Sequence, residues 1–308
     1  MKILLTGATG FIGGALAGVL AGEGHELRIL SRNPDATRGR IPSGARAFAW
    51  SGTGAPPAEA MEGVEAVAHL AGENIGNWPW TADRKRRILE SRVLGTRALV
   101  EAMGRAGSPR IFAAGSAMGY YGDGGDRILD ESAGAGWGFL AEVCAAWEDE
   151  IFKARAIGVR TVAVRTALVL GPGGGMLGKM ALPYRLGLGP VFGSGAQYWS
   201  WIHVNDCAGV FAHALNRASL SGPVNGCSPH PVTQREFADS LAAACHRPRL
   251  LRVPAMAMRL GMGEMAASLL EGQKGDCAKI LASGYRFRYP DLSSALRAAL
   301  SPGMERTV

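Results

Sequence analysis

Apolar residues in the first half of the chain follow two alternating patterns. Short continuous apolar runs, typical of buried parallel strands, occupy residues 2–6, 26–32, 46–50, 66–70, 110–114 and 160–165. Longer stretches at 11–23, 80–105 and 139–156 show the spacing of apolar residues that is typical of helices covering a sheet. This alternation predicts a parallel sheet with helices on both faces, the doubly wound α/β arrangement of a Rossmann fold.

The second half of the chain is less regular. Glycine and proline gather at residues 171–175 and 186–190, which predicts long loops of the kind that serve a site. Helices near 233–244 and 291–300 are too few for a second independent core. We therefore predict a sheet domain over 1–165, to which about 200–228 return, and a smaller C-terminal substrate lobe formed by 166–199 and 229–308.

Composition narrows the class of protein. Of 308 residues, 47% are apolar, and no apolar run approaches the roughly 18 residues that a membrane-spanning helix needs. The chain passes from Met-Lys directly into a strand, without the pattern of a secretory signal. Its five cysteines are scattered and form no Cys-x-x-Cys pair, which argues against a metal site and a disulfide framework. These features predict a cytoplasmic protein with no membrane partner.

The net charge of +7 raises the question of nucleic acid. The densest basic run, Arg84 to Arg87, lies in a predicted helix, and neither interleaved aromatic residues nor a nucleic-acid motif accompanies it. We interpret the run as a solvated helix face and expect no nucleic-acid partner. An anionic cofactor would account for part of the charge.

A glycine series, Gly7, Gly10 and Gly13, stands where the first strand meets the first helix. In a dinucleotide site the first glycine permits the tight turn, the second lets the backbone approach the pyrophosphate, and the third lets the helix pack on the strand. The phosphates would then meet the helix N-terminus. The predicted cofactor contacts also include the neighbouring residues Thr9, Phe11 and Ile12.

The end of the second strand indicates which dinucleotide binds. An NAD-binding chain places a carboxylate there for the ribose 2′-hydroxyl, whereas this chain has Ser31 and Arg32. A hydroxyl and a planar, bidentate guanidinium suit a 2′-phosphate. We therefore predict NADP as the cofactor, with a solvated arginine after a strand as the alternative.

Motifs along nearly the whole chain resemble those of extended short-chain dehydrogenases/reductases, the NAD(P)-dependent epimerase/dehydratase superfamily. They occur in the family's order at Thr6–Gly13, His69–Gly72, Gly95–Thr96, Ser116–Gly122, Gly171–Pro172 and Trp201–Asp206. Further segments resemble an atypical branch, the epimerase family proteins, at Ala71–Ile75, Gly119–Gly122 and Leu270–Lys274.

This resemblance implies further cofactor contacts. They fall at Leu70, Ala71, Gly72, Arg92 and the backbone of Leu168. Arg92 has two interpretations: a cofactor contact, as the resemblance implies, or a solvated arginine on an amphipathic helix.

The Tyr-x-x-x-Lys pair on which catalysis in the family rests is missing here. With its helix aligned on Glu148, Leu140 takes the tyrosine position and Cys144 the lysine position. In the family the tyrosine transfers a proton, and the lysine lowers the tyrosine pKa and holds the nicotinamide ribose. Leucine can do neither, and a cysteine on a helix among alanines is more typical of a small core residue than of a thiol acid.

Hydroxyl groups after the strand at 110–114 are the remaining catalytic candidates. Ser116 lies in the family's serine segment, and Tyr120 and Tyr121 follow a strand end that should face the nicotinamide. Both rings could instead only wall the pocket. We expect His203 and Asp206 to organise a loop rather than to perform chemistry.

The sequence thus favours an NADP-dependent oxidoreductase with an unusual proton relay and an unknown small-molecule substrate. The alternative is a catalytically silent NADP-binding regulatory or scaffold protein. Lys179 and Arg185 are candidate donors to a substrate diphosphate, with surface placement as the competing interpretation. We expect a monomer or a homodimer.

Overall fold

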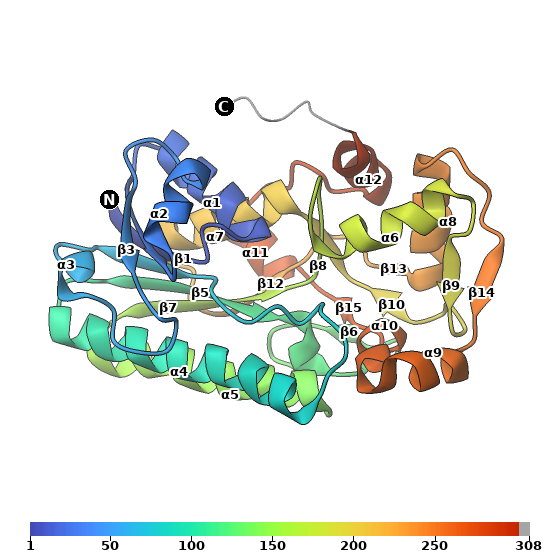
Figure 1. Ribbon diagram of the computed structural model, residues 1–308, viewed down its shortest axis with the longest axis horizontal. Coiled ribbons are helices and arrows are strands. Elements are labelled where there is room, and N and C mark those ends of the chain that lie inside the picture. The colour runs from blue at the N-terminus through green and yellow to red at the C-terminus, as the bar shows by residue number, and fades with distance from the viewer. Residues whose placement is uncertain (302–308) are drawn as a thin grey trace.

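A central sheet of seven parallel strands organises the molecule, in the order β12-β7-β5-β4-β1-β2-β3 (Figure 1). The computed structural model describes residues 1–301. The strands are β1 (Lys2–Thr6), β2 (Glu26–Ser31), β3 (Arg46–Ala49), β4 (Ala66–His69), β5 (Ile111–Ala117), β7 (Arg160–Thr166) and β12 (Gly222–Gly226). Every neighbouring pair is parallel, which confirms the doubly wound fold.

Helices cover both faces of this sheet. The helices α1 (Phe11–Gly22) and α7 (Val204–Asn216) lie on one face, and α4 (Ala82–Ala106) and α5 (Phe139–Phe152) on the other (Figure 1). Each face buries its own apolar cluster, so the sheet is covered on both sides as a parallel sheet requires. Local signals set the bounds of the helices: the Thr81 side chain accepts a hydrogen bond from the backbone of Arg84 where α4 begins.

The strand order places a crevice between β1 and β4. From β1 the chain winds outward through β2 and β3, then crosses back to β4 on the other side of β1. The chain after β1 continues into α1 on one face of the sheet and the chain after β4 into α4 on the other face. Ligands of open α/β folds bind at the carboxyl edge where the connections separate in this way.

The rest of the chain forms a smaller lobe beyond this edge (Figure 1). A third apolar cluster, with Trp199, Trp201 and Phe237 buried in it, fills this lobe. Its elements are β8 (Leu168–Leu170), α6 (Gly175–Arg185), β9 (Pro190–Phe192), β10 (Tyr198–Trp199), β11 (Trp201–His203), β13 (Val232–Thr233), α8 (Gln234–Ala244), β14 (Leu251–Val253), α9 (Ala255–Met262), α10 (Ala267–Leu270) and α12 (Leu292–Leu300).

Short elements complete the fold. They are α2 (Pro34–Thr37), α3 (Ala58–Met61), β6 (Ile128–Leu129), β15 (Lys274–Gly275), α11 (Ala278–Ala282) and the 3-10 turns η1 (Arg38–Arg40), η2 (Met118–Tyr121), η3 (Lys153–Ile157) and η4 (Gly263–Ala266).

Two sequence expectations need correction. Between the two glycine-rich segments expected as loops, at 171–175 and 186–190, the chain forms the unpredicted helix α6, whose buried Leu177, Ala181 and Tyr184 form one face at helical spacing. The helix expected to reach residue 156 ends at Phe152 and continues as the tighter turn η3.

Two further findings concern cysteines, metal-ligand groups and long apolar helices. All five cysteines are free. Residues 1–301 contain no group of side chains that could hold a metal ion and no helix long and apolar enough to cross a membrane.

The close packing of α1 on β1 can be tested with Gly13→Ala. A Cβ at Gly13 would collide with the backbone of Gly7, so we expect the free energy of unfolding to fall by about 1–3 kcal/mol or more. Gly18→Ala on the same helix is the matched control, because a Cβ there meets nothing within 4 Å, and it should stabilise by about 0.5–1 kcal/mol. Denaturant unfolding measures both; equal effects of the two substitutions would contradict the packing.

Candidate functional site

The glycine series forms the turn from β1 into α1 at the crevice. Gly7 has a φ of +73°, and a Cβ there would lie 2.8 Å from the backbone carbon of Leu70, so the loops after β1 and β4 touch. Gly10 is the exposed N-cap of α1. The first N–H groups of a helix have no partner within the helix, so this end can receive an anion.

The residues between the glycines are fixed from two sides. The Arg40 guanidinium of η1 donates to the carbonyl oxygen of Thr9 at 2.9 Å. On the other side, the ring of Phe11 lies against the loop at 171–175, where a Cβ at Gly171 or Gly175 would come within 2.9 Å of it. Ile12 is partly exposed in the first turn of α1. Arg40 was not predicted, because only the fold brings η1 beside the glycine turn.

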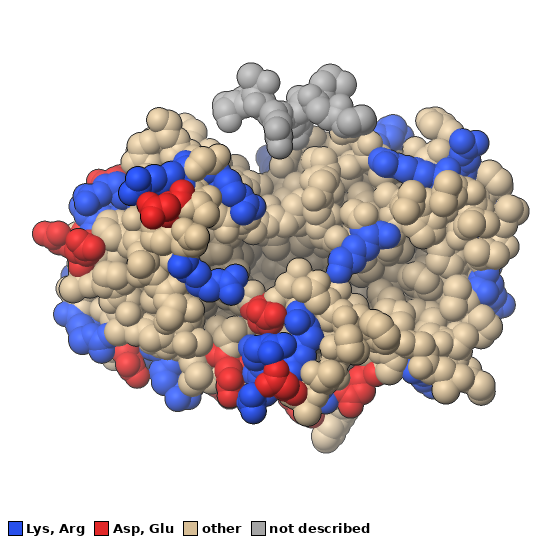
Figure 2. Space-filling model, in the orientation of Figure 1, with Lys and Arg blue, Asp and Glu red and all other residues tan. Residues whose placement is uncertain are grey.

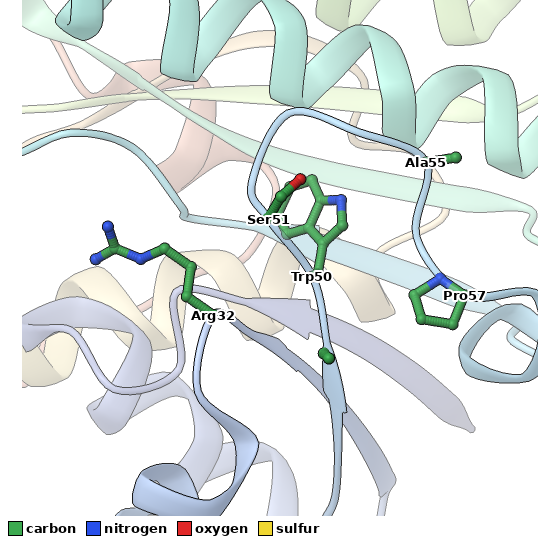
Figure 3. Close-up of a pocket in the computed structure, with 6 residues that line it drawn as sticks. Arg32, Trp50, Ser51, Ala55 and Pro57 are labelled. Carbon is green, nitrogen blue, oxygen red and sulfur yellow. The ribbon is translucent and has the colours of Figure 1, made fainter.

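Arg32 lines an open cavity of about 550 Å³ at the carboxyl ends of β2 and β3. It extends from the end of β2, and Trp50, Ser51 and Pro57 form the other side (Figure 3). The Arg32 side chain is exposed, and no hydrogen bond or ion pair of its guanidinium is found within residues 1–301. The cavity therefore offers an available cation, whereas the Trp50 side chain in its lining is 5% exposed and belongs to the core.

The Ser31 hydroxyl, unlike the Arg32 guanidinium, already has hydrogen-bond partners within the protein. Thr37 Oγ1 donates to the backbone carbonyl of Asn33, so the Ser31 hydroxyl donates its proton to Thr37 Oγ1 at 2.7 Å. The backbone N–H of Asn33 also donates to Ser31 Oγ at 3.2 Å. In this structure the proton of Ser31 is used to hold α2, so its contact with a 2′-phosphate stays a prediction that would require this hydrogen bond to be exchanged.

A buried hydrogen-bond network joins the ends of β1 and β4. The backbone N–H groups of Leu70 and Ala71 both donate to Thr6 Oγ1, at 3.1 Å each. The Thr6 hydroxyl therefore donates to Nδ1 of His69 at 2.7 Å, which leaves the proton of the neutral imidazole on Nε2. Leu70 and Ala71 can thus offer a ligand only their carbonyl groups or side chains.

Arg92 reaches under the loop after β4. Its Nη1 donates to the carbonyl oxygens of Glu73 and Ile88, at 3.1 Å each, and its guanidinium lies 5.1 Å from the ring centre of Trp147. A Cβ at Gly72 would lie 3.3 Å from the guanidinium carbon. Burial lowers the Arg92 pKa. The interpretation as a merely solvated helix arginine is therefore wrong, and contact with a cofactor stays a prediction.

Leu168 lies in β8 of the small lobe, which pairs with β11. Its side chain is partly exposed in β8, and its backbone N–H donates to the carbonyl oxygen of Ser200 at 3.1 Å. A cofactor contact at Leu168 would have to use another group of that residue.

An ion pair is buried behind the end of β5. Arg165 of β7 donates through Nε and Nη2 to the two carboxylate oxygens of Glu148 on α5, at 2.8 Å each. Ser116 Oγ donates to the same carboxylate at 2.6 Å. Arg165 Nη1 donates to the hydroxyl of Tyr121, which itself bonds Asn225 Oδ1 at 2.7 Å.

Two of the three candidate catalytic hydroxyls belong to this network. Ser116 and Tyr121 are 5% and 2% exposed, so neither presents its hydroxyl to a substrate. Burial raises the Tyr121 pKa to about 12. The structure therefore argues against both as proton donors: their hydroxyls stabilise the buried ion pair.

Tyr120 is the exception. Its ring is partly exposed, its centre lies 3.6 Å from the guanidinium carbon of Arg165, and it contacts the Tyr121 ring edge to face, with ring centres 5.5 Å apart. No hydrogen bond of its hydroxyl is found among the described residues. The Tyr120 hydroxyl is therefore the one candidate of the three that the described residues leave available.

The family's catalytic positions on α5 are apolar or inert. Leu140 packs against η2: a Cβ added at Gly119 would lie 3.3 Å from the Cβ of Leu140. Cys144 is 4% exposed, and burial raises the pKa of its thiol to about 12. The interpretation of Cys144 as a core residue is therefore preferred over a thiol acid.

His203 and Asp206 organise a loop, as expected. His203 accepts from the backbone of Asn205 at the start of α7. The Asp206 carboxylate accepts the backbone N–H groups of Arg288 and Tyr289, at 2.7 and 2.9 Å. The carboxylate thereby holds the chain before α12.

The basic groups singled out in the sequence have specific partners. Lys179 Nζ donates to the carbonyl oxygen of Gly76, which joins α6 to the loop before α4, whereas Arg185 is exposed. In the run at the start of α4, Arg86 and Arg87 pair with Asp83, and Arg84 with Glu73. Acidic and basic side chains alternate over this end of α4 in Figure 2, so the run is not a free basic patch.

A parallel sheet with a glycine turn at its switch point and a second lobe beyond its carboxyl edge defines a dinucleotide-binding fold of the epimerase and dehydratase type. Comparison with known families agrees: residues 3–225 match the NAD dependent epimerase/dehydratase family, and residues 253–299 match a domain of unknown function (DUF1731). The chain belongs to the NAD dependent epimerase/dehydratase family, as its motifs predicted.

Individual relatives match over almost their full length. The epimerase family protein YfhF of Bacillus subtilis is 36% identical, with 96% of this chain and 97% of that protein covered. The mouse epimerase family protein SDR39U1 is 38% identical, with 96% and 99% covered. A crystal structure of human SDR39U1 (isoform 2) with NADPH superimposes with a TM-score of 0.84 at 34% identity, with 97% and 99% covered.

The network at the end of β4 makes stability depend on pH. Burial, and then the charge of Arg92, lowers the pKa of His69 to about 3 from 6.5. Below pH 6.5 the unfolded chain therefore binds a proton that the folded chain does not. We expect the free energy of unfolding to be unaffected by this group above that pH and to fall by about 1.4 kcal/mol per pH unit below it.

His69→Asn tests this expectation, because the asparagine Oδ1 can replace Nδ1 as the acceptor for Thr6. The variant should lose much of the pH dependence between pH 6.5 and 4, measured by urea unfolding. His230→Asn is the matched control, since His230 is exposed. An unchanged pH profile in His69→Asn would contradict a buried neutral imidazole.

Proposed function

We propose that this chain binds NADPH and acts as an oxidoreductase on a small carbonyl or carbinol compound. The observation that carries the cofactor assignment is the available guanidinium of Arg32 in an open cavity, at the place where an NAD-binding chain has a carboxylate. The crystal structure of the related human protein with NADPH supports the same cofactor.

The residues present fit a dinucleotide. The exposed N-terminus of α1 at Gly10 suits the pyrophosphate, and Arg32 suits a 2′-phosphate. Arg40, on the Thr9 carbonyl, adds a second positive charge to this side of the crevice. When bound, NADPH would supply a hydride.

Among the chain's own groups, the Tyr120 hydroxyl is the best candidate to hold or donate a proton at a substrate oxygen. It is the partly exposed member of the candidate set, and the guanidinium carbon of Arg165 lies 3.6 Å from the centre of its ring. Arg165 would act only as a positioning residue, because it lies buried behind the ring.

A second candidate function rests on α5. Leu140 and Cys144 stand where the family has its tyrosine and lysine, and Cys144 is buried. These residues favour an NADPH-binding regulatory or scaffold protein that no longer performs the chemistry.

Cofactor preference is the first test. We expect NADPH to bind at least about tenfold tighter than NADH, worth roughly 1.4 kcal/mol, in calorimetric titration. Arg32→Ala should remove most of this difference and leave NADH binding little changed, because NADH has no 2′-phosphate. Arg105→Ala, exposed on α4, is the control. Equal weakening of both cofactors would exclude Arg32 as the 2′-phosphate contact, and no binding of either would refute the cofactor assignment.

Turnover separates the two candidate functions. In a screen of carbonyl compounds, substrate-dependent oxidation of NADPH should fall by roughly 10²- to 10⁴-fold in Tyr120→Phe, the range for loss of a general acid. NADPH affinity, measured by calorimetry, should stay unchanged. NADPH binding without turnover in the unsubstituted protein would favour the regulatory function, and undiminished turnover in Tyr120→Phe would exclude its hydroxyl.

A further inference from the structure

A second cavity, of about 370 Å³, lies between the N-terminal end of α5 and the segment from η4 to α10. It is separate from the Arg32 cavity and shares no lining residue with it. Its volume falls within the usual range of small-molecule sites, about 300–1,000 Å³. Nothing in the cofactor assignment uses it.

Aromatic rings form one wall of this cavity. Trp80 and Phe139 contact edge to face, with ring centres 5.4 Å apart, and the Trp80 indole nitrogen is held by the carbonyl oxygen of Ile75 at 2.9 Å. Trp137, also in the lining, is 92% exposed. Such rings offer flat apolar surface and π faces that attract cations.

The charged groups of the lining are mainly acidic. Glu142, Glu264 and Glu271 stand against a single cation, Lys85. Lys85 pairs with Glu264 at 2.6 Å, which leaves two carboxylates without an ion-pair partner among residues 1–301. Partial burial, and then the charge of Asp123, raises the pKa of Glu271. A cation beside this carboxylate would stabilise its ionised form.

The contacts of Lys85 illustrate how a cation can be held in this cavity. Its ammonium lies 4.8 Å from the ring centre of Phe139 while it pairs with Glu264. One side chain of the protein therefore already makes the two contacts, a carboxylate and an aromatic face, that an ammonium ligand would make.

We propose that this cavity binds a small organic cation with a flat apolar body, and that Lys85 is an internal competitor for its cation position. The aromatic wall would hold the apolar body and the carboxylates the charge. An anionic ligand is disfavoured, because it would meet three carboxylates around one ammonium that is already paired.

The test uses the full chain without cofactor, so its outcome is independent of NADPH binding. Three probes are titrated by calorimetry and tryptophan fluorescence: 3-(trimethylammonio)phenol, its neutral isostere 3-tert-butylphenol, and benzenesulfonate. We expect the cation to bind at least about fivefold tighter than the isostere, a typical gain from desolvated cation–π contact.

Substitutions at Lys85 and Glu271 should change the affinity for the cation in opposite directions. Lys85→Met should tighten binding of the cation severalfold, because it removes the competitor, and Glu271→Gln should weaken it. Lys153→Met, at the other end of α5, is the matched control and should change nothing. The Lys85 and Glu264 side chains are 30% and 64% exposed, so loss of this pair should leave the fold intact, as thermal unfolding will verify.

Three outcomes would overturn the assignment. Benzenesulfonate binding that disappears in Lys85→Met would identify an anion site instead. Equal affinity for the cation and its isostere would leave only an apolar cavity. Absence of binding by all three probes would exclude a small-molecule site of this class.

Discussion

The buried ion pair between Arg165 and Glu148 is the constraint on which the candidate site depends. It links β7 to α5, and through Ser116, Tyr121 and Asn225 it reaches β5, η2 and β12. Removing one partner of such a pair typically costs about 3–5 kcal/mol, because the other charge is left buried alone. Here every arm of the guanidinium has an acceptor, so the pair fixes a single arrangement of these elements. Tyr120 has its position because η2 is held in this way.

This network also explains what replaced the family's chemistry on α5. Leu140 closes against η2, while Glu148, two turns further along the helix, is tied to Arg165. Two arginines of other elements lie beside this helix: Arg92 of α4, near the Trp147 ring, and Arg165 of β7, paired with Glu148. The helix that catalyses in the wider family is a supporting element here, and the polar groups facing the site come from its neighbours.

The sequence predicted the sheet domain well because its signals are local. Apolar runs, the glycine turn and the capping residues act within a few positions, and the strands at 2–6 and 160–166 were found almost to the residue. Hydrogen bonds that depend on the folded chain could not be predicted: the Ser31 hydroxyl bonds Thr37, the Arg40 guanidinium bonds the Thr9 carbonyl oxygen, and the Tyr121 hydroxyl bonds Asn225. The helix α6 escaped notice because glycines and a proline obscure its periodicity.

Phe11 gives the molecule a mechanical link between its two halves. It stands in the first turn of the helix that would receive the phosphates, yet its ring is enclosed by the glycine loop that leads into α6. The small lobe therefore cannot move away from the sheet without breaking the contacts between this ring and residues 171–175. Movement of the small lobe away from the sheet would therefore also disturb the N-terminus of α1. A ligand bound to either the sheet domain or the small lobe should for the same reason restrict the movement of the other.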